Sequence, residues 1–447
     1  MSLFRKSHKP KQLVVGIDGV PRTLLFDMFQ RGIMPALKKL TGEETIHEQK
    51  SVLPTVSSAA WTSFMTGLHP PRHGIMGFIN KKRTSYDIVF PRREHIEADL
   101  LPELISQQGG KVFSMGVPVT YPPMHVNGMI ISCFLAPSLE KAVWPPSEVS
   151  TLQRIGYSMD PDPTVAHQDR TRFLHLVIES LKRRIAAIKH YFPLEPWDLF
   201  VAHCMETDRL HHFYWSDYED PSATFHDQFY EFYRVLDGLF EWIGNEMSAH
   251  DRIVILSDHG FSRLDYEVNL GKWFVDKGLM SLQNRTPGPP LANIQWQRTK
   301  AYVLIPGRVY LNLHGRDPEG TIDPAERERF ITELRDEFLA WRGPNGEPVI
   351  SSVLVDEAIP GWSEERECPD LLLLPGDGMD LKDGTLRPHV FEKKTLSGMH
   401  TFDDALLFLG GRPLQIERPP WIGDLAPSIL KLLGLPIPAG LDGEALV

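Results

Sequence analysis

The stretch 13-LVVGIDG-19 decides the fold. Residues 13–17 form an uninterrupted apolar run, which is typical of a strand buried on both faces of a parallel sheet. An apolar run followed at once by Asp, His or Glu recurs at 198–206 (DLFVAHCME) and 252–257 (RIVILS), and the segment 171–190, which precedes both, has apolar residues at helical spacing. This alternation predicts an α/β fold, a three-layer sandwich with a mostly parallel central sheet.

Composition and charge exclude several classes of protein. The 447 residues are 42% hydrophobic and 23% charged, as in ordinary globular proteins. The net charge of −11 is opposite to that of a dedicated nucleic-acid binder, so we expect no nucleic-acid partner. Apolar stretches such as 371–374 and 405–409 are far shorter than the ~20 residues that span a bilayer. We therefore expect no membrane span.

The chain start and the cysteines bear on location and redox chemistry. Residues 1–12 are basic and lack the apolar region of a secretory signal, which predicts a cytoplasmic protein. Cys133, Cys204 and Cys368 are widely spaced and form no C-x-x-C pair. They indicate neither a disulfide framework nor a cysteine zinc site.

The order of the segments predicts a core with an insertion. The segment 262–396 interrupts the alternating pattern and holds strands and helices of its own, for example RVYLNLHG and PAERERFITELRDEFLAWR. We predict a basic N-terminal arm at 1–12, a core at 13–261 and 397–447, and an inserted cap at 262–396. Ligands of such a sheet bind beyond the carboxyl ends of its strands.

Polar residues follow each of the three apolar runs. Asp18 ends the first run, Asp208 and His212 follow the second, and Asp258 and His259 follow the third. A spacing of four places Asp208 and His212 on one face of a helix. Asp and His side chains together suit a divalent cation such as zinc.

Two further segments add a hydroxyl and another imidazole. Ser57 would open a helix over 57–66, whose N-terminus favours an ionised hydroxyl, and His400 lies in 397-SGMHT-401. Each feature alone has an ordinary alternative interpretation, namely a turn Asp, a helix cap or a surface Asp–His pair. Thr55 and Ser58 are interpreted as helix caps only. The occurrence of all five features in one chain predicts a common site.

In order and spacing these residues resemble the alkaline phosphatase superfamily, and within it the type I phosphodiesterase and nucleotide pyrophosphatase branch. The segment 51–75, SVLPTVSSAAWTSFMTGLHPPRHGI, carries a P-T-x-[ST]…T-G-x-x-P-x-x-H-G-I pattern around the expected nucleophile. The resemblance covers 13–77 and the motifs up to His400, and no motif matches within 262–396. It implies an alkaline phosphatase-like core.

The resemblance also implies site residues. It implies Ser57 as the nucleophile and two metal sites, one made of Asp208, His212 and His400, and the other of Asp18, Asp258, His259 and the Ser57 oxygen. The branch usually has Thr in place of Ser57. Its phosphate-binding Asn after the H-G-I turn is replaced by Gly77 and Phe78, and Asn80 is predicted to substitute for it.

The chemistry of these residues agrees with the resemblance. Two divalent ions, with zinc favoured and manganese as the alternative, would balance three Asp carboxylates and a Ser57 alkoxide. The expected route is attack by Ser57 on phosphorus, departure of an alcohol or phosphate on the Asp208 side, and hydrolysis of the phosphoserine.

The predicted function is metal-dependent hydrolysis of small-molecule phosphate esters, preferably phosphodiesters or nucleotide pyrophosphates. The preference rests on bulky side chains near the motifs, namely Trp61, Phe78 and residues 213–215, which would offer stacking surface to a second substituent; as core residues they would offer none. A phosphomonoesterase is one alternative, and a non-catalytic metal-binding protein that binds a partner is another. The sulfatase and phosphoglycerate mutase nucleophile motifs are absent.

Overall fold

A computed structural model describes residues 11–248 and 251–447. Its largest sheet has eight strands in the order β2-β19-β9-β1-β8-β5-β6-β7. Five adjacent strands, from β9 to β6, run parallel, whereas β19 and β7 are antiparallel to their neighbours. Of the predicted basic arm, only Lys11 and Gln12 lie within the described residues, and Gln12 already belongs to β1.

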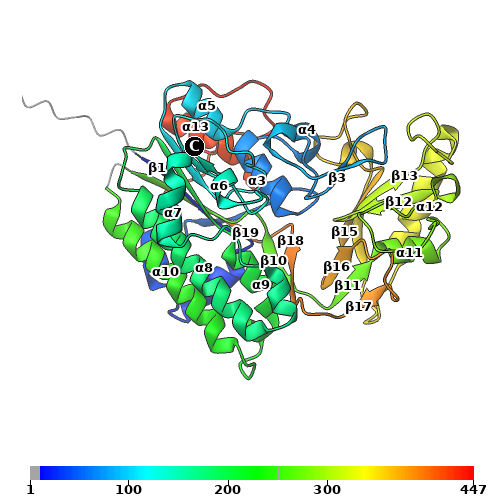
Figure 1. The fold of residues 1–447 in the computed structure, drawn as a ribbon, viewed down its shortest axis with the longest axis horizontal. Helices are drawn as coiled ribbons and strands as arrows, with labels where there is room; N and C mark the ends of the chain where they lie inside the picture. Colours follow the sequence, from blue (N-terminus) through cyan, green and yellow to red (C-terminus); the bar gives the residue numbers. More distant parts are fainter. Residues whose placement is uncertain (1–10, 249–250) are drawn as a thin grey trace, which may run out of the picture.

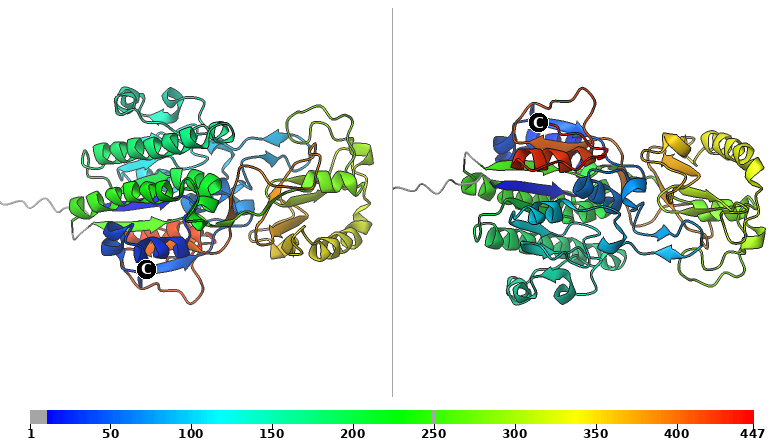
Figure 2. Two further views of the ribbon diagram at one scale, coloured as in Figure 1. Left: turned by 90° about the horizontal axis from the view of Figure 1, so that it is seen from below. Right: turned by 90° about the horizontal axis from the view of Figure 1, so that it is seen from above.

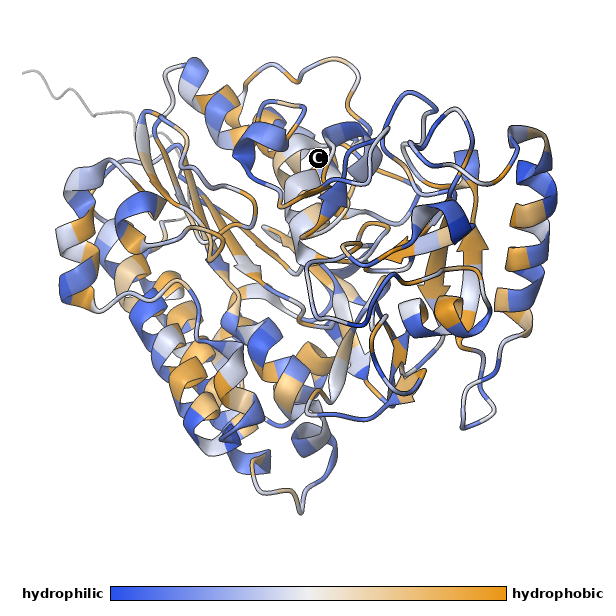
Figure 3. Ribbon diagram, turned by 45° about the vertical axis from the view of Figure 1, so that its right-hand side comes forward, coloured by the Kyte–Doolittle hydropathy of each residue, from blue (hydrophilic) through white to orange (hydrophobic). Residues whose placement is uncertain are grey.

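The strands of this sheet are short and mostly buried. Figure 3 shows them largely in the hydrophobic colours, as expected for strands covered on both faces. Their bounds are Gln12–Ile17 (β1), Ile46–Gln49 (β2), Val112–Met115 (β5), Gly128–Ile131 (β6), Val143–Trp144 (β7), Leu199–Cys204 (β8), Arg252–Leu256 (β9) and Ala405–Leu409 (β19).

Helices cover both faces of the sheet. Leu13 and Val15 of β1 belong to a core with α8, α9 and α10, and Val14 belongs to a second core with α3, α5 and α13. Figure 2 shows the sheet between these two helical layers. The predicted three-layer α/β sandwich is confirmed. The helix predicted at 57–66 is α3, Ser57–Thr66, and the one predicted at 171–190 is α8, Arg170–Tyr191.

The other α-helices include members of these layers, shorter connecting helices, and α11 and α12 of the segment 262–396. Their bounds are Arg22–Gln30 (α1), Pro35–Thr41 (α2), Pro70–His73 (α4), Leu101–Gln107 (α5), Leu139–Ala142 (α6), Val149–Ile155 (α7), Glu206–Glu219 (α9), His226–Glu246 (α10), Leu270–Asp276 (α11), Arg327–Ala340 (α12) and Leu425–Leu433 (α13).

The segment 262–396 builds a separate lobe, on the right of Figure 1. It has a hydrophobic core of its own, between Val268 and Leu381. Its sheets are β12-β13-β15-β14 and β16-β11-β17. The strand bounds are Tyr266–Asn269 (β11), Ala301–Leu304 (β12), Arg308–Leu311 (β13), Ile350–Leu354 (β14), Leu371–Pro375 (β15), Met379–Lys382 (β16) and Phe391–Glu392 (β17).

A two-stranded antiparallel ribbon links the lobe to the core. In this ribbon β10 (Gly260–Arg263) leaves the core and β18 (Gly398–Thr401) returns to it. A hairpin of β3 (Asn80–Lys81) and β4 (Ile88–Val89) reaches the lobe from the core, where Tyr86 stacks on Trp296. The division into core and cap domains stays a prediction. No helix among residues 11–248 and 251–447 is long and apolar enough to cross a membrane.

Candidate active site

The predicted site residues come together at one edge of the central sheet. The parallel strands β9, β1 and β8 are neighbours, so the residues that follow them meet at their carboxyl ends. Asp18 follows β1, Asp208 lies in the first turn of α9 after β8, and Asp258 follows β9. His400 reaches them on β18, paired with Phe261 of β10.

Asp208, His212 and His400 form the first candidate ligand group. His400 Nε2 lies 3.0 Å from His212 Nε2 and 3.1 Å from Asp208 Oδ1, and His212 Nε2 lies 3.3 Å from Asp208 Oδ1. Ligand atoms of a tetrahedral ion at the usual zinc distances are separated by roughly 3.3–3.6 Å. The three atoms are therefore spaced closely enough to share one ion.

Asp18, Asp258, His259 and Ser57 form the second group. His259 Nε2 lies 3.5 Å from Asp18 Oδ1, 3.4 Å from Asp258 Oδ2 and 3.3 Å from Ser57 Oγ. Ser57 Oγ is also 3.3 Å from Asp18 Oδ1. The rings of His259 and His400 stack with centroids 3.7 Å apart, so the two groups are adjacent.

Hydrogen bonds orient the imidazole rings toward the groups. His212 Nδ1 donates to the Gly398 carbonyl at 3.0 Å, and His259 Nδ1 donates to the Gly260 carbonyl at 2.9 Å. The neutral His259 ring therefore presents the lone pair of its Nε2 to Asp18 Oδ1, which also only accepts. This arrangement is repulsive unless a cation lies between the atoms.

Asp258 supplies a buried oxygen without a partner. Its Oδ1 accepts a hydrogen bond from the Gly19 N–H at 3.1 Å, but its Oδ2 has no hydrogen-bond partner in the described parts of the chain. Gly19 has a φ of +63°, and a Cβ there would lie 2.9 Å from the His259 ring, so a larger residue would disturb both contacts. A buried, unpaired carboxylate oxygen is costly unless it binds a cation.

The charges at the site shift the pKa values of its carboxyl groups in opposite directions. Burial and the nearby Asp18 charge raise the pKa of Asp258 well above its usual value. Burial also acts to raise the pKa of Asp208, but His212 and His400 outweigh it and hold that pKa well below the usual value. Burial lowers the pKa of His259 to about 3, so this ring is neutral at pH 7 and free to act as a ligand.

Asp18 Oδ2, the oxygen not directed at Ser57 and His259, is held by His203 and Trp61. Sequence analysis did not indicate His203. Asp18 Oδ2 accepts hydrogen bonds from His203 Nε2 at 2.7 Å and from Trp61 Nε1 at 2.9 Å. His203 Nδ1 lies 2.9 Å from the Gly116 carbonyl, and this second contact fixes the ring. Burial acts to raise the pKa of Asp18, but the hydrogen bond and charge of His203 bring it below the usual value.

The structure corrects the expected role of Trp61. Its ring was expected to offer stacking surface to a substrate, but the side chain is 0% exposed. It packs so closely on β1 that a Cβ on Gly16 would lie 2.2 Å from it. Trp61 therefore orients Asp18 from beneath and has no open face for a ligand. Of the other bulky residues, Phe213 and Trp215 are buried, and Phe78 is half-buried and lines a cleft.

Arg209 binds Asp208 Oδ2, the oxygen not directed at His212 and His400. Its Nη1 donates to Asp208 Oδ2 at 3.2 Å, and its Nε and Nη2 bind both oxygens of Asp160 at 3.1 and 2.7 Å. His211, the neighbour of His212, faces away from the ligand groups. It bonds to the Gly19 carbonyl and to the Tyr233 hydroxyl, so it fixes α9 against the loop after β1.

The family model for type I phosphodiesterase / nucleotide pyrophosphatase matches residues 12–403. The chain belongs to this family. It is therefore a phosphoric ester hydrolase of the alkaline phosphatase superfamily, as the sequence motifs predicted. No curated protein matches the chain.

Solved structures share the fold of this phosphodiesterase family member. Phosphonoacetate hydrolase from Sinorhizobium meliloti 1021, in complex with phosphonoformate, matches with a TM-score of 0.64 and 14% identity, over 95% of this chain and 96% of that one. Murine ectonucleotide pyrophosphatase/phosphodiesterase 5 matches with a TM-score of 0.56 and 14% identity, over 96% of each chain. At this identity the likeness concerns the fold.

Asn80, which is predicted to substitute for the phosphate-binding Asn of the phosphodiesterase family, begins β3. Its amide donates to the Gly74 carbonyl at 2.8 Å, and its oxygen accepts from the Met76 N–H at 3.2 Å and from Arg308 Nη1 at 3.4 Å. These bonds hold the turn after α4 against the lobe. A contact between Asn80 and a substrate stays a prediction.

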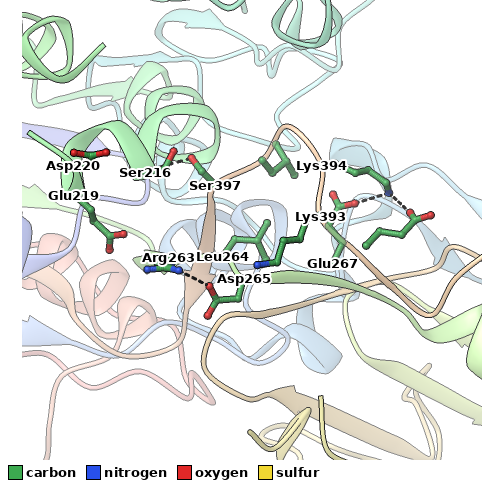
Figure 4. Close-up of a pocket in the computed structure, with 12 residues that line it drawn as sticks. Ser216, Glu219, Asp220, Arg263, Leu264, Asp265, Glu267, Lys393, Lys394 and Ser397 are labelled. Carbon is green, nitrogen blue, oxygen red and sulfur yellow. Dashed lines mark hydrogen bonds and ion pairs between the residues drawn. The ribbon is translucent and has the colours of Figure 1, made fainter. Parts of the chain in front are cut away.

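A cavity of about 460 Å³ is lined by residues of α9, the end of β10 and residues 392–397, and is shown in Figure 4. Five of its charged side chains form ion pairs among themselves. Lys394 bridges Glu267 and Glu392 at 2.5 and 2.8 Å, and Arg263 pairs with Asp265 at 3.0 Å. None of the predicted ligands lines this cavity, so the candidate active site is the edge of the sheet described above.

Proposed function

We propose that the protein hydrolyses phosphodiesters or nucleotide pyrophosphates through a Ser57 phospho-enzyme intermediate at a site for two divalent metal ions. The observation that carries this proposal is the second ligand group, in which Ser57 Oγ lies 3.3 Å from both Asp18 Oδ1 and His259 Nε2. A hydroxyl placed among metal ligands at a helix N-terminus is suited to act as a nucleophile.

The residues present fit two metal ions. Six Asp and His side chains form two groups of three, with ligand atoms 3.0–3.5 Å apart within the pairs measured. The unpartnered Asp258 Oδ2 supports a cation in the second group. Mixed imidazole and carboxylate ligation favours zinc, with manganese as the alternative.

The proposed mechanism follows from the placement of these side chains. Two bound divalent ions would lower the pKa of the Ser57 hydroxyl and neutralise charge on the phosphate. Ser57 Oγ forms a bond to phosphorus while the bond to the leaving oxygen breaks, and water then cleaves the phosphoserine. His203 and Trp61 hold Asp18 in orientation throughout, and Arg209 does the same for Asp208.

We expect the enzyme to prefer a diester to a monoester. The half-buried Phe78 lines the cleft beside the first ligand group and offers surface to a second substituent. Our prediction is that kcat/KM for bis-p-nitrophenyl phosphate exceeds that for p-nitrophenyl phosphate by about tenfold or more. A higher kcat/KM for the monoester would favour the phosphomonoesterase alternative.

The proposal also covers the substrate class, the location of the protein and the role of the segment 262–396. A small-molecule phosphate ester is the proposed substrate, and the cytoplasm is the proposed location. The segment 262–396 is proposed to act as a cap, because its residues form one wall of the cleft beside the first ligand group.

A further inference from the structure

A cleft of about 740 Å³ opens beside the first ligand group. His212 and His400 lie on its lining, together with Thr55 and Val56 just before Ser57. The other predicted site residues are not on the lining, namely Asp18, Ser57, Asp208, Asp258 and His259. The cleft therefore adjoins one ligand group only, the one made of Asp208, His212 and His400.

If the proposed function holds, this position places the leaving group of the substrate in the cleft. In an in-line displacement the attacking and leaving oxygens lie on opposite sides of phosphorus, and two metal sites each bind one of them. Ser57 belongs to the second ligand group. The leaving oxygen then faces the first group, and whatever is attached to it extends into the cleft.

The walls of the cleft are largely apolar. One wall comes from the core and the other from β15 and the loop before β13 of the lobe. Figure 1 shows β15 on the side of the lobe that faces the core. The half-buried apolar residues on the lining are Leu53, Phe78, Ile305, Pro306, Leu374, Pro375 and Phe402. Such surface favours an apolar ligand.

The charges on the lining are mainly negative. Lys382 is the one Lys or Arg among the residues that line the cleft, and it pairs with Asp380 at 2.6 Å. Asp377 and Asp404 add further carboxylates, whereas Asp403 on the same lining pairs with Lys50 at 2.6 Å. Asp377 is exposed. A polyanionic group placed here would meet like charges in a partly apolar environment, which is unfavourable.

We propose that this cleft binds the leaving group and selects an uncharged, apolar alcohol, aryl or alkyl, over pyrophosphate. The proposal rests on the proposed function and narrows it, from phosphodiesters or nucleotide pyrophosphates to diesters with apolar leaving alcohols. Recognition lies in the apolar surface of Leu374 and Phe402 and in the negative charge around them.

Two substrates with the same retained group test the proposal. Water cleaves thymidine 5′-(p-nitrophenyl phosphate) to thymidine 5′-phosphate and p-nitrophenol, and cleaves dTTP to thymidine 5′-phosphate and pyrophosphate. With the zinc-loaded full-length protein, we expect kcat/KM to be about tenfold or more higher for the p-nitrophenyl ester. An equal or higher value for dTTP overturns the cleft proposal and leaves the proposed function standing. If the protein cleaves neither substrate, the cleft proposal and the proposed function are both overturned.

Charge variants locate the selection in the cleft. Leu374→Lys and Asp377→Lys each add positive charge to the lining, and Asp377 is exposed, so its replacement does not disturb packing. Each is expected to shift the kcat/KM ratio toward dTTP by about fivefold or more. The matched control is Leu339→Lys, on exposed α12 surface outside the cleft, which should leave the ratio unchanged. An unchanged ratio in Asp377→Lys, or a shift as large in the control, overturns the proposal.

Discussion

Replacing Ser57 with alanine is expected to lower kcat by about three orders of magnitude or more while the protein keeps its fold and its metal content. The reason is that the Oγ of Ser57 is the hydroxyl placed 3.3 Å from both Asp18 and His259. The Asp and His ligands remain in place in this variant. Steady-state kinetics, elemental analysis and circular dichroism of Ser57→Ala measure the three properties.

Ser58→Ala is the matched control for this prediction. Ser58 lies on the same turn of α3, is fully buried, and its Oγ has no hydrogen-bond partner among the described residues. Removing this hydroxyl is expected to change kcat by less than about threefold. If Ser58→Ala were as inactive as Ser57→Ala, or if Ser57→Ala kept its turnover, the assignment of the nucleophile would be wrong.

Replacing Asp258 with asparagine is expected to remove about one equivalent of metal per chain and to lower kcat about a hundredfold or more. Asp258 contributes the unpartnered Oδ2 of the second group, and an amide there is a weaker, uncharged ligand. Asp208→Asn should release the ion of the first group instead. Elemental analysis after dialysis against limiting zinc measures both losses.

An acidic residue outside the ligand groups provides the control for metal content. Asp403 is exposed and pairs with Lys50 at 2.6 Å, so Asp403→Asn removes the same charge without removing a ligand. It should retain both equivalents of metal. Full metal content in Asp258→Asn and Asp208→Asn, or wild-type protein that binds no divalent ion at saturating zinc or manganese, would refute the two-metal proposal.

The parts of the site that follow strands could be predicted from sequence. Asp18 and Asp258 each end an apolar run, and a parallel sheet brings the ends of such runs to one edge. The helix that begins at Ser57 could also be predicted, because its start and end depend on residues nearby in the sequence. The placement of these residues in the structure agrees with the expectation, and their roles stay proposals.

The residues that orient the ligands could not be predicted in the same way. His203 lies inside an apolar strand, and its partner Asp18 is 185 residues away in the chain. A buried histidine in a strand signals that some partner exists, but only the folded sheet shows which one. The position of Trp61 on a helix fits either a core residue or a ligand contact, and its packing against Gly16 places it in the core.

The lobe at 262–396 illustrates the same limit. Its strands and helices were predicted as a unit because they interrupt a regular pattern. No motif in it indicated which residues face the core. Lys382 and Leu374 reach the cleft because β15 and β16 are placed there by the β10–β18 ribbon, and this depends on contacts between distant parts of the chain.

The stereochemical course at phosphorus tests the central claim most directly. Transfer to Ser57 and then to water comprises two in-line displacements, each of which inverts the configuration. Hydrolysis of a single diastereomer of an isotopically chiral phosphorothioate diester should therefore proceed with net retention in the wild-type enzyme. Net inversion would show a single displacement by water, and it would contradict the Ser57 intermediate.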